Sequence, residues 1–210
     1  MPDTLVLYDL APSPNNIKVR IALNYKGLPF TKIPVDPQNR SEVIKVSTQP
    51  LTPVLVHDDR VVFDSGAILR YLDANFPATP RLFSTDYDTM HEIERWEGIG
   101  RREMSEPVEI VFEQFFKPKK DPSELERASR LLHDHTGVVE KRLAGVPWLV
   151  WETMTAADVT LAPMIWYGML SPAVAALSPL HKFFAEGLSL GSGREKTRAW
   201  VTKVMSHDRP

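Results

Sequence analysis

Residues 52–72, TPVLVHDDRVVFDSGAILRYL, decide the fold. The stretch predicts two short apolar strands, Thr52–Val56 and Val61–Phe63, on either side of a polar turn. Asp64 and Ser65 then cap a helix, because their side chains can accept hydrogen bonds from its first N–H groups. The apolar residues of that helix recur at helical spacing: Ile68, Tyr71 and Leu72. The segment is therefore a β-hairpin that runs directly into a helix.

Two features of this stretch indicate a peptide ligand. Pro53 removes one hydrogen-bond donor at the start of a strand. A cis bond before it would turn the backbone groups of Thr52 outward, where an extended peptide can pair with them. Farther along, the free N–H groups at the start of the Ser65 helix suit a carboxylate. Together they predict a socket for a small peptide that carries an acid.

Composition excludes several classes of protein. The chain has 210 residues, 43% hydrophobic and 25% charged, as in ordinary soluble domains. Its formal net charge of -2 gives no electrostatic reason to bind nucleic acid or a membrane. The chain has no cysteine, which excludes disulfides, thiolate metal sites and a cysteine nucleophile. No apolar run approaches the roughly 20 residues of a spanning helix, and the early strand leaves no room for a signal peptide, so we expect a cytoplasmic protein.

The chain divides near residue 80, at a stiff proline-containing linker, Pro77–Arg81. Before the linker, strands and helices alternate, and further elements precede the hairpin described above. These are strands at Leu5–Tyr8 and Phe30–Val35, a helix that begins at Asn15 or Asn16 and ends at Tyr25, and a short helix at Ser41–Val46.

Beyond the linker the pattern is helical throughout. Asp86–Phe116 reads as one long or kinked helix with its bend at Pro107. Asp121 begins the next helix, since a cap, a proline and an acid follow one another there. The apolar stripe of that helix is Leu125, Ala128, Leu132, Val139 and Leu143. Thr155–Leu170 is a fully apolar helix, and Arg194–Met205 is the last one.

This order of elements resembles the cytosolic glutathione transferase family over nearly the whole chain. The resemblance rests on a first-helix segment at Ser13–Arg20, a proline step at Thr52-Pro53, an acid-serine pair at Asp64-Ser65 and a buried capping box at Thr155–Asp158. It implies an α/β plus all-α fold: a thioredoxin-like domain at residues 1–77, a linker at 78–84 and an all-helical domain at 85–210.

The resemblance also implies assembly and chemistry. Family members commonly pair as homodimers through the segments that are Ser65–Asn75 and Asp86–Phe116 here. Their co-substrate is glutathione, and no metal is involved. The enzyme must ionise a thiol of pKa near 8.5, and lowering that pKa by two units takes about 2.7 kcal/mol. One or two well-aimed neutral donors can supply this.

Ser13 and Asn15 share the role of thiol activator in this interpretation. The alternative is structural: Ser13 is then a turn hydroxyl and Asn15 an ordinary helix cap. Tyr8 is a further hydroxyl candidate, since some classes use a tyrosine nearby, but it lies inside a strand and is expected to pack.

The glutathione contacts follow from the same resemblance. Thr52 pairs main chain to main chain with the cysteinyl residue, in the geometry that Pro53 imposes. Ser65 binds the γ-glutamyl carboxylate and Asp64 faces the amine; a plain capping pair is the alternative reading.

One segment departs from the family. The glycine and the basic or amide residue that help to hold the glycyl carboxylate are replaced by Pro50 and Leu51. The nearest substitutes are Gln49, Asn39 and Arg40. We therefore expect glutathione to bind more weakly than in members that keep the usual residues.

The leading functional hypothesis is glutathione-dependent transfer to a small apolar electrophile, or a related peroxidase or reductive activity on the same thiolate. The electrophile pocket is expected in the helical half, near Arg101 and Met104. The alternative is a non-catalytic binding or regulatory protein of the stringent-starvation or elongation-factor kind. Two histidines, His133 and His135, lie on different helix faces and are no metal pair. The others are expected to be exposed: His57, His91, His181 and His207.

Overall fold

The computed structural model describes residues 4–209 and shows two compact units. The first unit comprises the described residues up to Ser84 together with those from His207 onward, and the second is Thr85–Ser206. The predicted fold class is confirmed, because the first unit contains a four-stranded sheet with helices and the second is helical.

The sheet of the first unit is mixed. Its strands are β1 (Leu5–Asp9), β2 (Thr31–Pro34), β3 (Val54–His57) and β4 (Arg60–Phe63), in the spatial order β2-β1-β3-β4. β1 runs parallel to β2, while β3 is antiparallel to both β1 and β4. The predicted hairpin is thus confirmed, and the Thr52–Pro53 peptide bond before it is cis.

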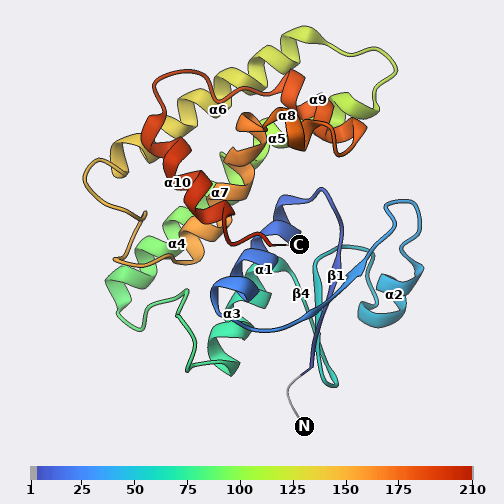
Figure 1. Ribbon diagram of the computed structural model, residues 1–210, viewed down its shortest axis with the longest axis vertical. Coiled ribbons are helices and arrows are strands. Elements are labelled where there is room, and N and C mark those ends of the chain that lie inside the picture. Colours follow the sequence, from blue (N-terminus) through green and yellow to red (C-terminus); the bar gives the residue numbers. More distant parts are fainter. Residues whose placement is uncertain (1–3, 210) are drawn as a thin grey trace. The chain divides into compact units, whose positions relative to one another are not determined.

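Three helices accompany this sheet: α1 (Pro14–Tyr25), α2 (Ser41–Ser47) and α3 (Ser65–Asn75). α1 and α3 lie side by side on one side of the sheet, and α2 lies on the other (Figure 1). The predicted start of α1 was too late. Ser13 is the N-cap and Pro14 the first helical residue, which suits a residue without an N–H.

A buried ion-pair network fastens the end of the chain to this unit. The Arg20 Nε and Nη2 atoms donate to the two carboxylate oxygens of Asp208 at 2.7 and 2.9 Å. The Nη1 of Arg20 donates to Asp9 at 2.7 Å. The ring of His207 packs edge-on against Tyr25, with 5.4 Å between the ring centroids. The residues after the last helix are therefore a structural part of the N-terminal unit.

The linker segment is held by α3. The Asp73 carboxylate accepts hydrogen bonds from the backbone N–H groups of Leu82 and Phe83, both at 2.9 Å. Lys26 donates to Asp73 at 2.7 Å and to the carbonyl of Pro80 at 2.9 Å. These contacts fix the linker on the first unit.

The second unit consists of helices. They are α4 (Tyr87–Arg102), α5 (Ser105–Phe116), α6 (Pro122–Arg142), α7 (Ala156–Trp166), the 3₁₀ turn η1 (Tyr167–Met169), α8 (Pro172–Ala175), α9 (Pro179–Gly187) and α10 (Glu195–Met205). The bend expected at Pro107 lies earlier, between Arg102 and Ser105. Pro107 instead occupies the first turn of α5, where its missing N–H leaves no intrahelical bond unmade.

The core of this unit is α7, which is apolar and buried along its length. Its N-terminus has the predicted capping box, in which the Thr155 N–H donates to Asp158 at 2.8 Å. α4 packs closely on α7 at Gly100, where an added Cβ would lie 2.9 Å from Thr160 Cγ2 and from Leu161 Cδ1.

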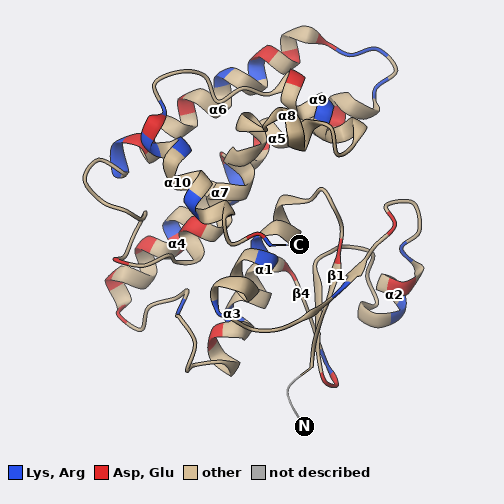
Figure 2. Ribbon diagram, in the orientation of Figure 1, with Lys and Arg blue, Asp and Glu red and all other residues tan. Residues whose placement is uncertain are grey.

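Charged residues of both signs occur along α4 and α6 (Figure 2). No helix within residues 4–209 is long and apolar enough to cross a membrane.

Candidate functional site

A pocket of about 380 Å³ lies in the first unit, beside the cis proline. Six of the residues expected to contact the ligand line it, together with two that were not expected to. The six are Asn15, Gln49, Thr52, Pro53, Asp64 and Ser65, and the further two are Leu51 and Phe63. The start of α1, the loop before β3 and the start of α3 thus meet at one place.

The start of α3 forms the polar end of this pocket. Asp64 caps the helix, with Oδ1 accepting from the Ala67 N–H at 2.9 Å. Its φ of 70° is unusual for a residue other than glycine, and such positions cluster at functional sites. The exposed Asp64 uses one oxygen as the cap, so Oδ2 can accept from an amine. The free N–H groups of the first turn suit an anion.

The Ser65 hydroxyl sits between two partners. Its oxygen accepts from the Nζ of Lys18 at 3.2 Å, and its proton is donated to the Oδ1 of Asn15 at 3.3 Å. Ser65 is 8% exposed and Lys18 only 2%. Lys18 does not line the pocket and approaches Ser65 from the protein interior. A buried ammonium thus stands directly behind the polar end.

The sequence reasoning missed Lys18, because a lysine on an amphipathic helix is usually assigned to its solvent face. It also missed the role of Asn16, which is fully buried. Asn16 accepts from the Leu10 N–H at 3.1 Å and donates to the Thr52 hydroxyl at 3.1 Å. Asn16 therefore connects the loop that precedes Ser13 to the side chain of Thr52, the residue before the cis proline.

Two of the expected site residues are not among those that line the pocket. Ser13 caps α1 through its carbonyl, which accepts from Asn16 and Ile17 at 3.1 and 3.0 Å. Its half-buried side chain makes no capping bond, so the hydroxyl is not committed to the helix. Arg40 donates instead to the carbonyl of Pro37 at 3.3 Å.

Gln49 lines the pocket, but its amide is used by its own loop. The Nε2 atom donates to the Ser47 hydroxyl at 2.8 Å and to the Leu51 carbonyl at 3.0 Å. The Oε1 atom accepts from the Leu51 N–H at 2.7 Å. The adjacent Leu51 side chain is 73% exposed. This end of the pocket therefore presents apolar surface and an amide that is already hydrogen-bonded.

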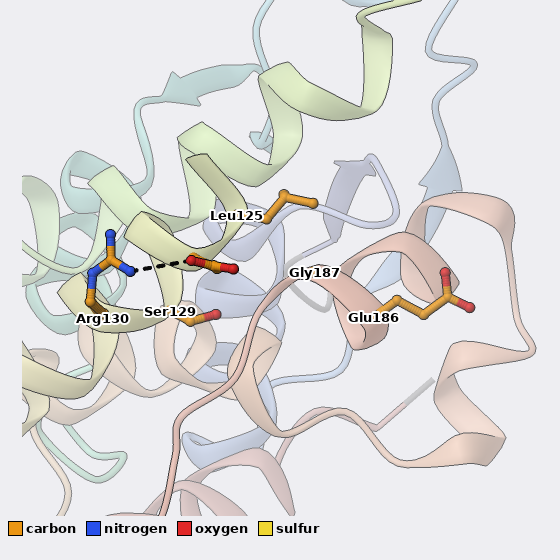
Figure 3. A pocket seen from close by; sticks show the side chains of 6 residues that line it. Leu125, Ser129, Arg130, Glu186 and Gly187 are labelled. Carbon is orange, nitrogen blue, oxygen red and sulfur yellow. Dashed lines mark ion pairs between the residues drawn. The ribbon is translucent and has the colours of Figure 1, made fainter. Parts of the chain in front are cut away.

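A second pocket, of about 410 Å³, lies between α6 and α9 in the helical unit (Figure 3). Its charged residues form exposed ion pairs: Arg130 with Glu126 at 3.6 Å, and Glu186 with Lys182 at 3.9 Å. The Ser129 hydroxyl accepts from the Ser189 N–H at 3.1 Å and so supports the loop after α9. Although this pocket is slightly larger, its polar groups serve the fold and converge on no ligand position.

The remaining candidates are structural. His133 and His135 contact the carbonyls of Leu190 and Glu103, at 3.0 and 2.7 Å. The described residues contain no group of three or more His, Cys, Asp and Glu side chains that could hold a metal ion. The expectation of exposed histidines holds for His91, but His57 and His207 are half-buried. It was wrong for His181, which is 8% exposed and whose pKa is lowered by burial. Met104 is fully buried and packs in the core.

The first unit matches a known family of domains. The family model for the glutathione S-transferase N-terminal domain matches residues 7–80, which include every residue that lines the first pocket. A stringent starvation protein A homolog from Haemophilus ducreyi is 25% identical over 199 residues, covering 91% of this chain and 80% of that protein. Glutathione S-transferase 3 from Zea mays is 26% identical over 184 residues, covering 83% and 80%.

A solved structure gives the same fold. A glutathione transferase family member from Pseudomonas fluorescens pf-5, determined with two glutathione bound, superposes with a TM-score of 0.76. The match covers 97% of this chain and 92% of that one, at 24% identity. The domain match, the relatives that span most of the chain and the shared two-part fold lead to one conclusion: residues 7–80 match the N-terminal domain of glutathione S-transferases, and the chain has the glutathione S-transferase fold.

Proposed function

We propose that this protein binds glutathione in the pocket beside Pro53 and ionises its thiol for attack on a small apolar electrophile. The observation that carries the proposal is the start of α3, where a helix N-terminus, the Ser65 hydroxyl and the Asp64 carboxylate share one pocket with Thr52. Glutathione has complementary groups: an α-carboxylate, an α-amine and a peptide backbone.

The γ-glutamyl end fits the polar end of the pocket. Its carboxylate accepts from the Ser65 hydroxyl and from the first N–H groups of α3, while its amine donates to Asp64. The cysteinyl main chain pairs with the main chain of Thr52, as in strand addition. Asn16 supports this edge, because it holds the Thr52 hydroxyl and the loop before α1 at once.

Thiol ionisation is assigned to the start of α1. The Ser13 hydroxyl keeps its proton and donates a hydrogen bond to the sulfur, while the thiol loses its own proton to solvent. The Nδ2 of Asn15 is a second donor, because Asn15 lines the same pocket. Lowering a thiol pKa from 8.5 to about 6.5 needs about 2.7 kcal/mol, within reach of two such donors. The same thiolate would serve a peroxidase or reductase reaction.

Titration calorimetry with glutathione tests the binding step. We expect saturable binding in the millimolar range or tighter, and at least a tenfold loss in Ser65→Ala, which removes a bond to a charged group. Ser129→Ala, in the second pocket, is the matched control and should bind normally. Absence of heat at millimolar glutathione would rule out both the binding site and the enzyme.

The pH dependence of conjugation tests the activation step. Ser13→Ala should raise the pH midpoint of the rate by about one to two units, with little change in affinity, since the peptide's ends are held elsewhere. If the profile of Ser13→Ala is unchanged and that of Asn15→Ala is shifted, the activator is Asn15 instead.

A second candidate function is a non-catalytic, glutathione-binding or regulatory protein. It is favoured by the likeness to a stringent starvation protein A homolog and by the loop at Gln49, whose amide faces its own backbone. Saturable binding without turnover of any standard aryl or peroxide substrate would select this candidate over the transferase.

The assembly and location follow from the same proposal. We expect a homodimer through α3 and the α4–α5 segment, whose mixed charges suit a self-complementary patch (Figure 2). Light scattering should then give about twice the chain mass of 23.8 kDa, and a monomer at high concentration would contradict it. A cytoplasmic location stays a prediction.

A further inference from the structure

We propose that the pocket recognises the γ-glutamyl-cysteinyl part of its ligand and forms no ionic contact with a glycyl carboxylate, so that its substrates are γ-glutamyl thiols with or without the terminal glycine. Buried Lys18 supplies the positive charge for the γ-glutamyl end. This inference rests on the proposed function and narrows its substrate class.

At the polar end of the pocket, a buried lysine lies behind the Ser65 hydroxyl. Lys18 donates to the Ser65 hydroxyl oxygen, and that hydroxyl donates its only proton to Asn15. When a carboxylate arrives, the hydroxyl can rotate its proton from Asn15 to the ligand while Lys18 keeps its bond to the oxygen. The carboxylate then lies within about 6 Å of the ammonium, from the sum of two hydrogen-bond lengths. Because Lys18 is 2% exposed, water screens this attraction weakly.

Within residues 4–209, the rest of the pocket offers no cation to a ligand carboxylate. None of the eight described residues that line it carries a positive charge. Gln49 is the polar side chain at the loop end, and three hydrogen bonds within its own loop occupy its amide. Turning it toward a ligand would exchange three hydrogen bonds within the loop for one contact at the pocket rim, which returns little. Arg40 does not line the pocket, and its Nε donates to the carbonyl of Pro37 at 3.3 Å.

The two ends of the pocket therefore differ strongly in charge and polarity. One end offers a buried ammonium, a hydroxyl, helix N–H groups and a carboxylate, which match the zwitterionic head of a γ-glutamyl group. The other end offers Leu51, which is 73% exposed. A glycyl carboxylate placed there stays in solvent and adds little to affinity.

Calorimetry with three natural thiols tests this directly: glutathione, γ-glutamylcysteine and cysteinylglycine. We expect the first two to bind within about threefold of each other, and the third to give no saturable heat up to about 10 mM. If γ-glutamylcysteine binds more than about tenfold more weakly than glutathione, the inference is wrong while the proposed function stands. If neither γ-glutamyl thiol binds, both are wrong.

Two variants separate the ends of the pocket. Leu51→Lys adds a cation at the loop end, so it should tighten glutathione at least about fivefold and leave γ-glutamylcysteine unchanged. Lys18→Met keeps a long apolar side chain without the charge and should weaken both ligands equally, by about tenfold or more. Lys18→Arg should restore part of that loss, and Lys45→Met, at an exposed lysine, is the control.

The two variants are expected to differ in which of the two ligands they affect. An equal gain for both ligands in Leu51→Lys, or a loss in Lys18→Met confined to glutathione, would overturn the assignment of the ends. Should Lys18→Met fail to fold by circular dichroism, Leu51→Lys decides alone, because the exposed Leu51 side chain is not part of the core.

Discussion

The indole N–H of Trp200 donates to the Oδ1 of Asp158 at 2.9 Å, inside the core of the helical unit. The same carboxylate accepts from the Leu149 N–H at 3.0 Å and from the N–H and hydroxyl of Thr155 at 2.8 and 3.0 Å. Burial raises the pKa of Asp158, and these donors oppose the rise. One side chain thus joins α7, the segment before it and α10.

We predict that Asp158→Asn is severely destabilising. Its amide keeps one acceptor and turns an NH₂ group toward donors, so at least one buried donor loses its partner, at a cost of about 3 kcal/mol in the free energy of unfolding. Trp200→Phe removes a single bond and should cost about 2 kcal/mol with its small cavity. Urea unfolding measures both, and a change below about 1 kcal/mol in Asp158→Asn would contradict the prediction.

The Glu140 carboxylate accepts hydrogen bonds from the first turn of α10, and this capping depends on pH. Although burial raises its pKa, hydrogen bonds from the Thr197 N–H and hydroxyl, at 2.8 and 2.7 Å, and from the Lys196 N–H bring the net pKa below the ordinary 4.5. A lowered folded pKa means that the stabilisation is present above about pH 4.5 and is lost as the pH falls through the folded value.

Glu140→Gln should therefore lower the free energy of unfolding by about 1 kcal/mol at pH 7, because the first turn of α10 loses a charged acceptor. The difference from the wild type should shrink as the pH falls below 4.5. Unfolding measured between about pH 7 and 3 tests this, with the exposed Glu109→Gln as control. A difference that does not change with pH would show that the charge plays no part.

Two glycines in α4 should respond in opposite ways to alanine. At Gly98 an added Cβ would meet only the Arg102 guanidinium at 3.3 Å, the mobile end of an exposed side chain. Gly98→Ala should stabilise by about 0.5–1 kcal/mol through helix propensity. At Gly100 the Cβ would lie 2.9 Å from two atoms of α7, so Gly100→Ala should destabilise by about 1–3 kcal/mol. Thermal unfolding that ranks them the other way would refute the close α4–α7 packing.

The end of the chain should matter for the stability of the first unit. Asp208→Ala leaves the buried Arg20 with Asp9 as its acidic partner and should cost about 2–3 kcal/mol. Arg209→Ala, one residue later and exposed, should change stability by less than about 0.5 kcal/mol. Chemical unfolding of both variants measures the contrast, and equal values would mean that the ion pair contributes nothing.

Local patterns predicted most of the fold. The β-hairpin, the cis proline and the capping box of α7 each depend on a few adjacent residues, and all are present. No helix was predicted for residues 171–187, where the structure has α8 and α9. Ser171-Pro172 and Ser178-Pro179 nevertheless carry the same cap-and-proline signature that predicted the start of α6. The break between α4 and α5 was placed too late, at Pro107, because a proline is also tolerated in the first turn of a helix.

The site was less predictable, since its contacts join residues far apart in sequence. Asn16 reaches Thr52 across 36 positions, and Lys18 reaches Ser65 across 47. No local rule selects such partners. The role of Gln49 was hard to predict for a different reason. An amide suits a ligand contact, but this one makes three hydrogen bonds to residues two positions away in its own loop.

The ion pair between Arg20 and Asp208 spans 188 positions, and this has a consequence for biosynthesis. During translation α1 leaves the ribosome long before Asp208 does, so Arg20 has Asp9 as its acidic partner until the whole helical unit has been made. The N-terminal unit is thus discontinuous in sequence and becomes complete only after the second unit has been synthesised. A premature stop codon between α10 and Asp208 would therefore remove a buried contact of the first unit and leave residues 85–206 unchanged.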